Sequence, residues 1–355
     1  MFSRGVSERR AAAMLSVPSS DDAAMTETAM SRADMMTSRV EARSKAVRRL
    51  AGGDALFRNL TFAAAIIVLL ILGGTIGSLI QGSLPAFKAF GFGFFVTDVW
   101  NPSDDKFGAG AAIYGTIVTS FIAMLIAVPV GLGIAIFLTE LCPPALRRPI
   151  GVAIELLAGI PSIIYGVWGL FVFAPFLQQY VQPGLIAAFA NVPGLNALFA
   201  GPPFGIGVLT ASLILAIMVL PFVTSISRDV FNTVPSMLKE SAYGVGCTTW
   251  EVVSSIVIPY TRVGVIGGCM LALGRALGET MAVTFVIGNA HDISASILAP
   301  GTTISATIAN EFTEADGVLY TSSLIALGLI LFMITFVVLA FARLMLMRLE
   351  GKAGK

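Results

Sequence analysis

The chain is poor in charged residues, in cysteine and in histidine. Asp, Glu, Lys and Arg make up 12% of its 355 residues, whereas a soluble globular domain carries about 25%. The net charge of +1 gives no basic excess and argues against a nucleic-acid partner. The three cysteines, Cys142, Cys247 and Cys269, form neither a disulfide framework nor a Cys-x-x-Cys metal spacing. We therefore expect no metal site and no cofactor, and we expect an interfacial role for His291, the single histidine.

The sequence also lacks the signatures of an ATP-hydrolysing enzyme. It has no Gly-x-x-x-x-Gly-Lys-Ser/Thr loop to cradle phosphates, and the closing stretch 351–355 does not match that spacing. No nucleophile is paired with a base in the manner of a membrane hydrolase. We expect no enzymatic activity of its own, so an ATP-driven process would need a separate ATPase subunit.

What the chain has in excess is apolar sequence. Apolar residues make up 56% of the chain, and the mean hydropathy is +0.87. Six apolar runs are each long enough to cross a bilayer as a helix. We expect these helices at residues 60–82, 111–139, 150–176, 206–227, 262–288 and 320–343. The fold class that this predicts is an all-α integral membrane protein with six transmembrane helices.

The positions of Lys and Arg predict the orientation and the domain limits. Of the 22 Lys and Arg residues, 19 fall on the side that holds both chain ends. Because cytoplasmic loops are rich in Lys and Arg, we expect both termini in the cytoplasm. Residues 1–57 are expected to form a disordered cytoplasmic tail, 58–345 the membrane domain and 346–355 a second cytoplasmic tail.

One stretch places full charges inside an apolar run. In Gly274-Arg275-Ala276-Leu277-Gly278-Glu279, Arg275 lies about 20 Å of helix from either end of its run, near the middle of a bilayer about 30 Å thick. Charges at that depth are costly and usually mark function. The i,i+4 spacing puts Arg275 and Glu279 on one helix face, where they can pair. Two interpretations stay open: a polar path for a substrate anion, or a buried ion pair that holds helices together.

Two glycines beside these charges have a simpler interpretation. Gly274 and Gly278 form a Gly-x-x-x-Gly face, and small residues let neighbouring membrane helices approach closely. We therefore expect helix packing on this face.

The second informative segment is the loop 228–262. Pro235 suits the first turn of a short helix, Gly246 suits a left-handed end to it, and Pro259 interrupts a second helix. The loop is therefore expected to form a helix–Gly–helix elbow in the cytoplasm. A connection between two spans needs only a few residues, so an elbow of this length indicates a specific task.

The elbow resembles the "EAA" motif of ABC importer permeases. The spacing of that motif is reproduced by Glu240-Ser241-Ala242, then three residues, Gly246, nine residues and Ile256-x-Ile258-Pro259. Ser241 stands in place of Ala, and Ile258 in place of Leu. In that family the elbow is a coupling helix that sits in a groove of the cytoplasmic ATPase. The resemblance implies ATPase coupling by Glu240, Ser241, Ala242, Gly246 and Pro259.

A narrower resemblance covers residues 60–345. The stretch from Gly274 to Val283, together with Leu157–Gly166 and Trp100-Asn101-Pro102, resembles the C-type permease subunit of the phosphate-specific (Pst) importers. This implies the fold of ABC importer permeases, a bacterial inner-membrane location and a transport path at Arg275, Glu279 and Thr280. It also implies four kinds of partner: a homologous A-type permease, two ATPase subunits, an external phosphate-binding protein and phosphate itself.

Physics alone leaves two alternatives. Arg275 suits an anion, because guanidinium binds oxyanions bidentately and stays charged, but sulfate, phosphonate or molybdate would fit as well as phosphate. An ion-coupled secondary transporter or a channel is the other alternative, in which the elbow at 228–262 would have no explanation.

Overall fold

The computed structural model describes residues 20–353, and these divide between Thr75 and Ile76 into two compact units. Helix α2 covers Ser20–Phe90. Its helical backbone at 20–57 differs from the disordered tail that we expected there. Residues 20–57 contain no proline and are rich in Ala, Arg and Met, which are strong helix formers. The first 19 residues of the expected tail lie outside the described residues.

Six helices within residues 20–353 are long and apolar enough to cross a membrane, as the sequence predicted. They are Leu56–Phe90, Gly110–Leu141, Ser162–Phe189, Val208–Phe231, Thr249–Leu277 and Val318–Arg348. The last of these is part of α16 (Val318–Ala353), which continues as a helix into the expected tail at 346–355.

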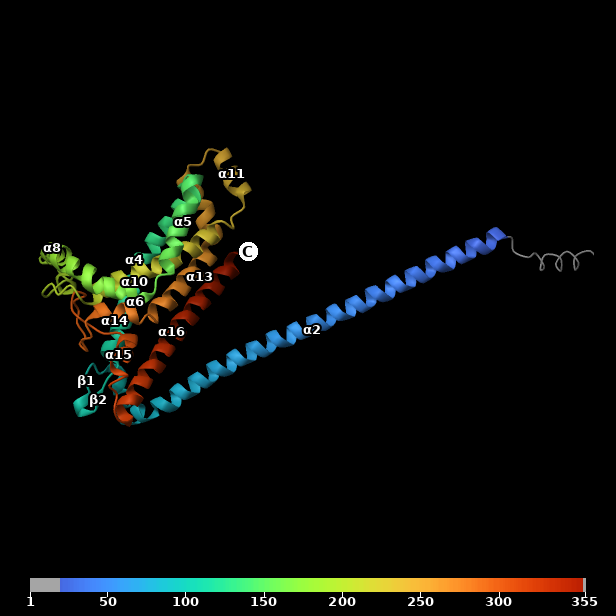
Figure 1. The fold of residues 1–355 in the computed structure, drawn as a ribbon. Helices are drawn as coiled ribbons and strands as arrows, with labels where there is room; N and C mark the ends of the chain where they lie inside the picture. Colours follow the sequence, from blue (N-terminus) through green and yellow to red (C-terminus); the bar gives the residue numbers. More distant parts are fainter. Residues whose placement is uncertain (1–19, 354–355) are drawn as a thin grey trace, which may run out of the picture. The chain divides into compact units, whose positions relative to one another are not determined.

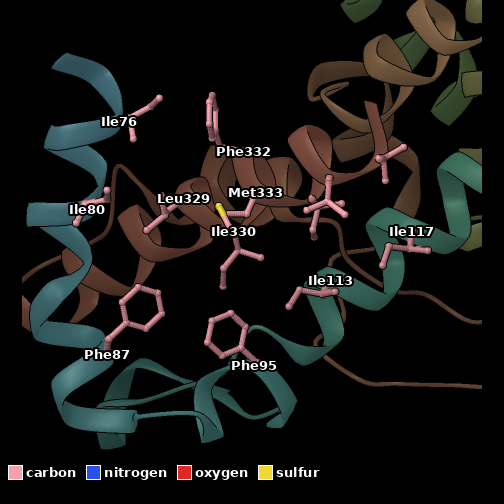
Figure 2. A pocket seen from close by; sticks show the side chains of 13 residues that line it. Ile76, Ile80, Phe87, Phe95, Ile113, Ile117, Leu329, Ile330, Phe332 and Met333 are labelled. Atoms are coloured by element: carbon pink, nitrogen blue, oxygen red, sulfur yellow. The ribbon is translucent and has the colours of Figure 1, made fainter. Parts of the chain in front are cut away.

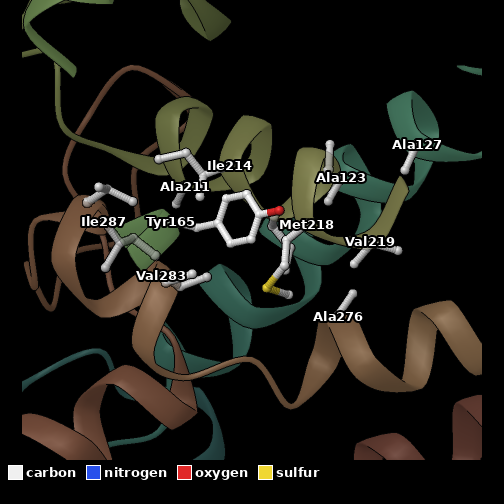
Figure 3. Close-up of a cluster of buried hydrophobic side chains, with 14 of the residues drawn as sticks. Ala123, Ala127, Tyr165, Ala211, Ile214, Met218, Val219, Ala276, Val283 and Ile287 are labelled. Atoms are coloured by element: carbon white, nitrogen blue, oxygen red, sulfur yellow. The ribbon is translucent and has the colours of Figure 1, made fainter. Parts of the chain in front are cut away.

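The core of the second unit lies between α4 (Gly110–Ile136) and α10 (Val208–Phe231). Figure 3 shows Ala123 and Ala127 of α4 close to Met218 and Val219 of α10 within one cluster of buried side chains. Lipid tails are as apolar as Leu, so close packing has to hold membrane helices together, and small residues permit it. Accordingly, α10 is the most buried of the six spans.

The third span does not follow the continuous helix that we predicted at 150–176. Instead α5 (Pro144–Ala158) ends, and α6 (Ser162–Trp168) begins after Pro161. Proline has no N–H and disfavours a helical residue before it, so the helix breaks there. The span continues from α6 through η3 (Gly169–Phe173), α7 (Ala174–Phe176), η4 (Leu177–Val181) and α8 (Gln182–Phe189).

The fifth span was also predicted wrongly as a continuous helix, at 262–288. It comprises α12 (Thr249–Val252), the π-helical turn η5 (Val253–Val257) and α13 (Ile258–Leu277). The chain leaves helical geometry at Gly278, and a new short helix, α14 (Met281–Ile287), follows. Glycine is a poor helix former, which favours a helix end at this position.

The two ends of the second unit differ in structure (Figure 1). At one end, the hairpin end, β1 (Trp100–Asn101) pairs antiparallel with β2 (Lys106–Phe107), with Trp100 opposite Phe107. The short elements α3 (Gly93–Val96), η1 (Pro102–Asp104), α9 (Leu195–Leu198) and α15 (Ile304–Glu311) also belong to the connections between spans. At the opposite end lie η2 (Phe137–Leu141) and α11 (Ser236–Gly244), and we call this the α11 end.

An apolar groove of about 710 Å³ runs between α2, α4 and α16 (Figure 2). Its lining includes Ile80, Phe87, Ile113 and Met333, and every lining side chain is apolar. Such a surface suits the hydrocarbon region of a bilayer, where polar groups are costly.

Packing of α4 on α10 can be tested at two glycines of the same helix. A Cβ at Gly131 would lie 2.8 Å from Cγ1 of Val223, whereas a Cβ at Gly133 meets no atom within 4 Å. We expect Gly131→Leu to destabilise the chain by about 1–3 kcal/mol, the usual cost of overpacking. Gly133→Leu is the matched control and should melt like the wild type. Thermal unfolding of the purified chain in detergent measures both, and equal melting temperatures would contradict this packing.

Candidate functional site

The predicted elbow is present and has the predicted turn. Helix α11 begins after Pro235, Gly246 adopts a φ of +93°, and α12 follows. Thr248 caps α12: its hydroxyl oxygen accepts from the backbone N–H of Glu251, whose carboxylate accepts from the Thr248 N–H. This reciprocal cap satisfies two donors that a helix start leaves free.

The elbow has a buried face and an exposed face. Ala242 is only 8% exposed and packs with Phe231, Val234 and Val252. Of the predicted coupling residues, Ala242 therefore faces its own chain, while Glu240, Ser241, Gly246 and Pro259 are exposed.

The exposed face also carries large apolar side chains that the motif did not point to. Val245 is 82% exposed and Trp250 70% exposed, and Met237 and Tyr243 lie open beside them. Exposed apolar patches on a polar connection mark interaction surfaces. The signal was present in the sequence as large apolar residues in a loop between spans.

The second candidate site is the interruption of the fifth span at 278–280. Arg275 occupies the last turn of α13, and its guanidinium carbon lies 4.5 Å from the ring centroid of Phe222 on α10. A cation over an aromatic face is held by the ring's negative face. Arg275 is exposed in this single chain, so its outer side is free to meet a partner or a substrate.

Glu279 does not pair with Arg275 in the part of the chain that the structure describes. Its Oε1 accepts from the backbone N–H of Ala282 at 3.3 Å, so the carboxylate caps the start of α14. The i,i+4 argument failed because the helix ends at Gly278, and residues beyond a helix end no longer share its face.

The predicted packing glycines have different roles. A Cβ at Gly274 would lie 3.7 Å from Leu339 of α16, an ordinary contact. At Gly278, which follows the last residue of α13, such a Cβ would meet only the backbone of its own turn, so no other helix packs closely on this glycine. Tight contacts lie earlier in α13, where Cβ atoms at Gly264 and Gly268 would lie 2.6 Å from α10 side chains.

Thr280, the third predicted path residue, is half-buried in the break, where its carbonyl oxygen accepts from the Thr284 hydroxyl at 2.7 Å. Among the described residues, no group of three His, Cys, Asp or Glu side chains could hold a metal ion.

Sequence reasoning missed a cluster at the hairpin end. The His291 ring stacks on Trp100 with centroids 5.4 Å apart, and its Nε2 lies 3.9 Å from a carboxylate oxygen of Glu311. Tyr320 donates a hydrogen bond to Glu311. Burial lowers the pKa of His291, while the charges of Glu311 and Asp292 oppose that shift. His291 thus helps to attach the 288–303 segment to the β1–β2 hairpin.

Comparison with known proteins identifies the family. The family described as "Binding-protein-dependent transport system inner membrane component" matches residues 127–350. A protein of Mesorhizobium japonicum named "Phosphate transport system permease protein PstC" is 70% identical over 88% of this chain and 95% of its own length. The chain belongs to this family of transport permeases. A protein of the same name from Pasteurella multocida is 57% identical over 85% of this chain and 94% of its own length.

Solved structures agree on the fold. A bacterial ABC transporter involved in the import of the acidic polysaccharide alginate contains a chain that matches with a TM-score of 0.54 and 19% identity, over 83% of this chain and 96% of that one. The MetNI methionine ABC transporter in an inward-facing conformation gives 0.51 and 14%, over 67% and 94%. These likenesses confirm the predicted fold class, the six-helix ABC importer permease.

The conformation of the elbow can be tested at two neighbouring glycines. A Cβ added at Gly244 or at Gly246 would meet no atom within 4 Å, but only Gly246 has a positive φ. We expect Gly246→Ala to destabilise the elbow by about 1 kcal/mol, because L-residues are strained in this region. Gly244→Ala should leave the elbow as stable as before or slightly more stable. Hydrogen exchange of residues 236–252 measures both, and equal exchange in the two variants would refute the left-handed turn.

The lowered pKa of His291 predicts a pH dependence. At pH values just below 6.5, the ordinary pKa of histidine, His291 is protonated in the unfolded chain but stays neutral in the folded chain. Stability therefore falls as the pH drops through about 6.5 and levels off below the folded pKa. We expect the melting temperature to decrease between pH 7 and pH 5. His291→Gln should remove that part of the decrease, and an unchanged pH profile in this variant would show that His291 does not cause it.

Proposed function

We propose that this chain is the permease subunit of an ATP-driven importer that moves inorganic phosphate into the cytoplasm. The observation that carries the proposal is its 70% identity, over 95% of that protein's length, with a phosphate transport system permease protein. The exposed guanidinium of Arg275 supports an anionic substrate, because it offers a fixed positive charge and paired N–H donors.

The proposed location is a bacterial inner membrane with both termini in the cytoplasm. The support is the distribution of charge, because 19 of the 22 Lys and Arg residues fall on one side of the predicted spans. In this orientation the α11 end is cytoplasmic. The hairpin end, with Lys88 and Lys106, then faces outward.

The proposed partners follow from the exposed surfaces. ATP hydrolysis is assigned to two cytoplasmic ATPase subunits, and the exposed face of the elbow, with Met237, Val245 and Trp250, is their proposed docking surface. A homologous A-type permease is proposed to cover the face on which Arg275 is exposed. An external phosphate-binding protein is proposed to dock at the hairpin end.

The transport path is proposed to pass the break at 278–280. Arg275, in the last turn of α13, would attract the anion, and Thr280 lies in the break that follows this helix. Glu279 would repel an anion in open solution, but its carboxylate is engaged by the Ala282 N–H at the positive end of α14. A site with one strong cation and a nearby carboxylate binds weakly enough to release its substrate.

The role of Arg275 gives a direct test. We expect Arg275→Gln to lose most ATP-driven uptake of radiolabelled phosphate, at least tenfold, because a neutral amide cannot supply the charge. Arg275→Lys should be partly impaired, since a point charge replaces the planar fork. Uptake is measured in proteoliposomes that hold the assembled importer, with ATP inside and the binding protein outside, and excess sulfate or molybdate tests the substrate class.

Glu279 provides the contrast for this test. Glu279→Gln keeps a side-chain oxygen for the Ala282 N–H and should be milder than Arg275→Gln. If the two residues instead formed a structural ion pair, the double variant Arg275→Gln with Glu279→Gln would recover both abundance and uptake. Such recovery would remove Arg275 from the path, and inhibition by sulfate equal to that by unlabelled phosphate would overturn the choice of phosphate.

A further inference from the structure

A buried ion pair joins the elbow to the second span. Lys239 lies on α11 and Glu140 lies on η2, the π-helical turn that continues α4. The Lys239 Nζ is 2.5 Å from the Glu140 Oε1, and the two side chains are 18% and 6% exposed. The elbow resemblance covers neither member of this pair.

Burial makes this pair informative. Removing two charges from water costs free energy that their mutual attraction often does not recover. Apolar residues of similar size often stabilise a fold equally well. The best-attested use of such a pair is to fix one arrangement among several. Here the arrangement that it fixes is the position of α11 relative to the end of α4.

The apolar contacts of α11 fix its position relative to α4 less precisely than the ion pair does. Ala242 packs in an apolar cluster with Ala135 and Phe231, and apolar contacts are non-directional, so they tolerate sliding. A charged hydrogen bond is directional and short. The ion pair is therefore the contact that converts a displacement of α11 into a displacement of α4.

The receiving turn also has a contact with α5. Arg147 of α5 donates to the backbone carbonyl of Thr139, at 2.9 Å, next to Glu140 in η2. π-Helical turns are uncommon and often occur at functional positions. From η2, α4 packs along α10, whose Phe222 lies under the Arg275 guanidinium. A continuous set of contacts thus leads from the elbow to the break in the fifth span.

We propose that Lys239 and Glu140 are positioning residues that transmit movement of the elbow to the second span, so that ATP hydrolysis by the partner drives transport. This rests on the proposed function, and it assigns the link between the two candidate sites to one pair of side chains.

The test is a charge exchange in the assembled importer, with ATP hydrolysis and phosphate uptake measured on the same proteoliposomes. We expect Lys239→Glu and Glu140→Lys each to retain ATPase binding and hydrolysis. The ratio of phosphate taken up to ATP hydrolysed should fall at least tenfold in each. The double exchange restores the pair and should recover at least half of the wild-type ratio. A pair that serves stability alone would change the amount of complex but not this ratio.

Neutral variants keep the proposal falsifiable if the reversed charges prevent folding. Glu140→Gln and Lys239→Met retain the side-chain volume and should lower the ratio in the same direction. The matched control is Glu155→Gln, which removes the 2.6 Å pair between Glu155 and Arg228 without touching α11, and its ratio should stay at the wild-type value.

The outcomes separate the two proposals. An unchanged ratio in the neutral variants, or a double exchange that fails to recover while both single variants assemble, overturns the role of the ion pair. Absence of ATP-driven phosphate uptake by the wild-type importer would instead overturn the proposed function.

Discussion

Backbone hydrogen bonding inside the bilayer is the constraint on which the rest of this structure depends. Hydrocarbon contains no water, so each N–H and C=O needs a partner within the protein. This chain nevertheless interrupts helices at 159–161 and at 278–280. At the first break the Tyr165 hydroxyl donates to the Leu157 carbonyl at 2.8 Å, and at the second the Glu279 carboxylate accepts from the Ala282 N–H. Side chains thus replace helical bonds at both breaks, and α6 and α14, which begin there, pack on each other.

The number of spans could be predicted from the sequence because it depends on a local property, the length of apolar runs. The turn at Gly246 could be predicted for a similar reason, since a left-handed helix end depends on one residue. The breaks were missed because hydropathy averages over a window and does not register a few residues such as 159–161, although Pro161 was a local signal for the first of them. At 278–280 the Gly-x-x-x-Gly pattern misled us, because Gly278 ends a helix in this chain.

The surroundings of the site residues depend on partners far apart in the sequence. The i,i+4 spacing predicted an ion pair between Arg275 and Glu279. In the structure Arg275 lies over the ring of Phe222, and Glu279 accepts a hydrogen bond from the Ala282 N–H. Likewise His291 has no informative neighbours along the chain, but the fold stacks it on Trp100. Patterns along one helix identify candidate residues, while tertiary packing decides which pairs they form.

Helix α10 connects these observations. Its Phe222 lies under Arg275, the adjacent Val223 packs against Gly131 of α4, and Phe231 near its end packs against Ala242 of the elbow. A helix packed this closely along its length resists local deformation, because protein interiors have crystal-like density. Under the proposal that the Lys239–Glu140 pair displaces the end of α4, this close packing would carry that displacement to α10 as a rigid body, and interfaces between such rigid elements switch between discrete arrangements. In that proposal, the small residues that allow α4 and α10 to approach closely would serve transmission as well as stability.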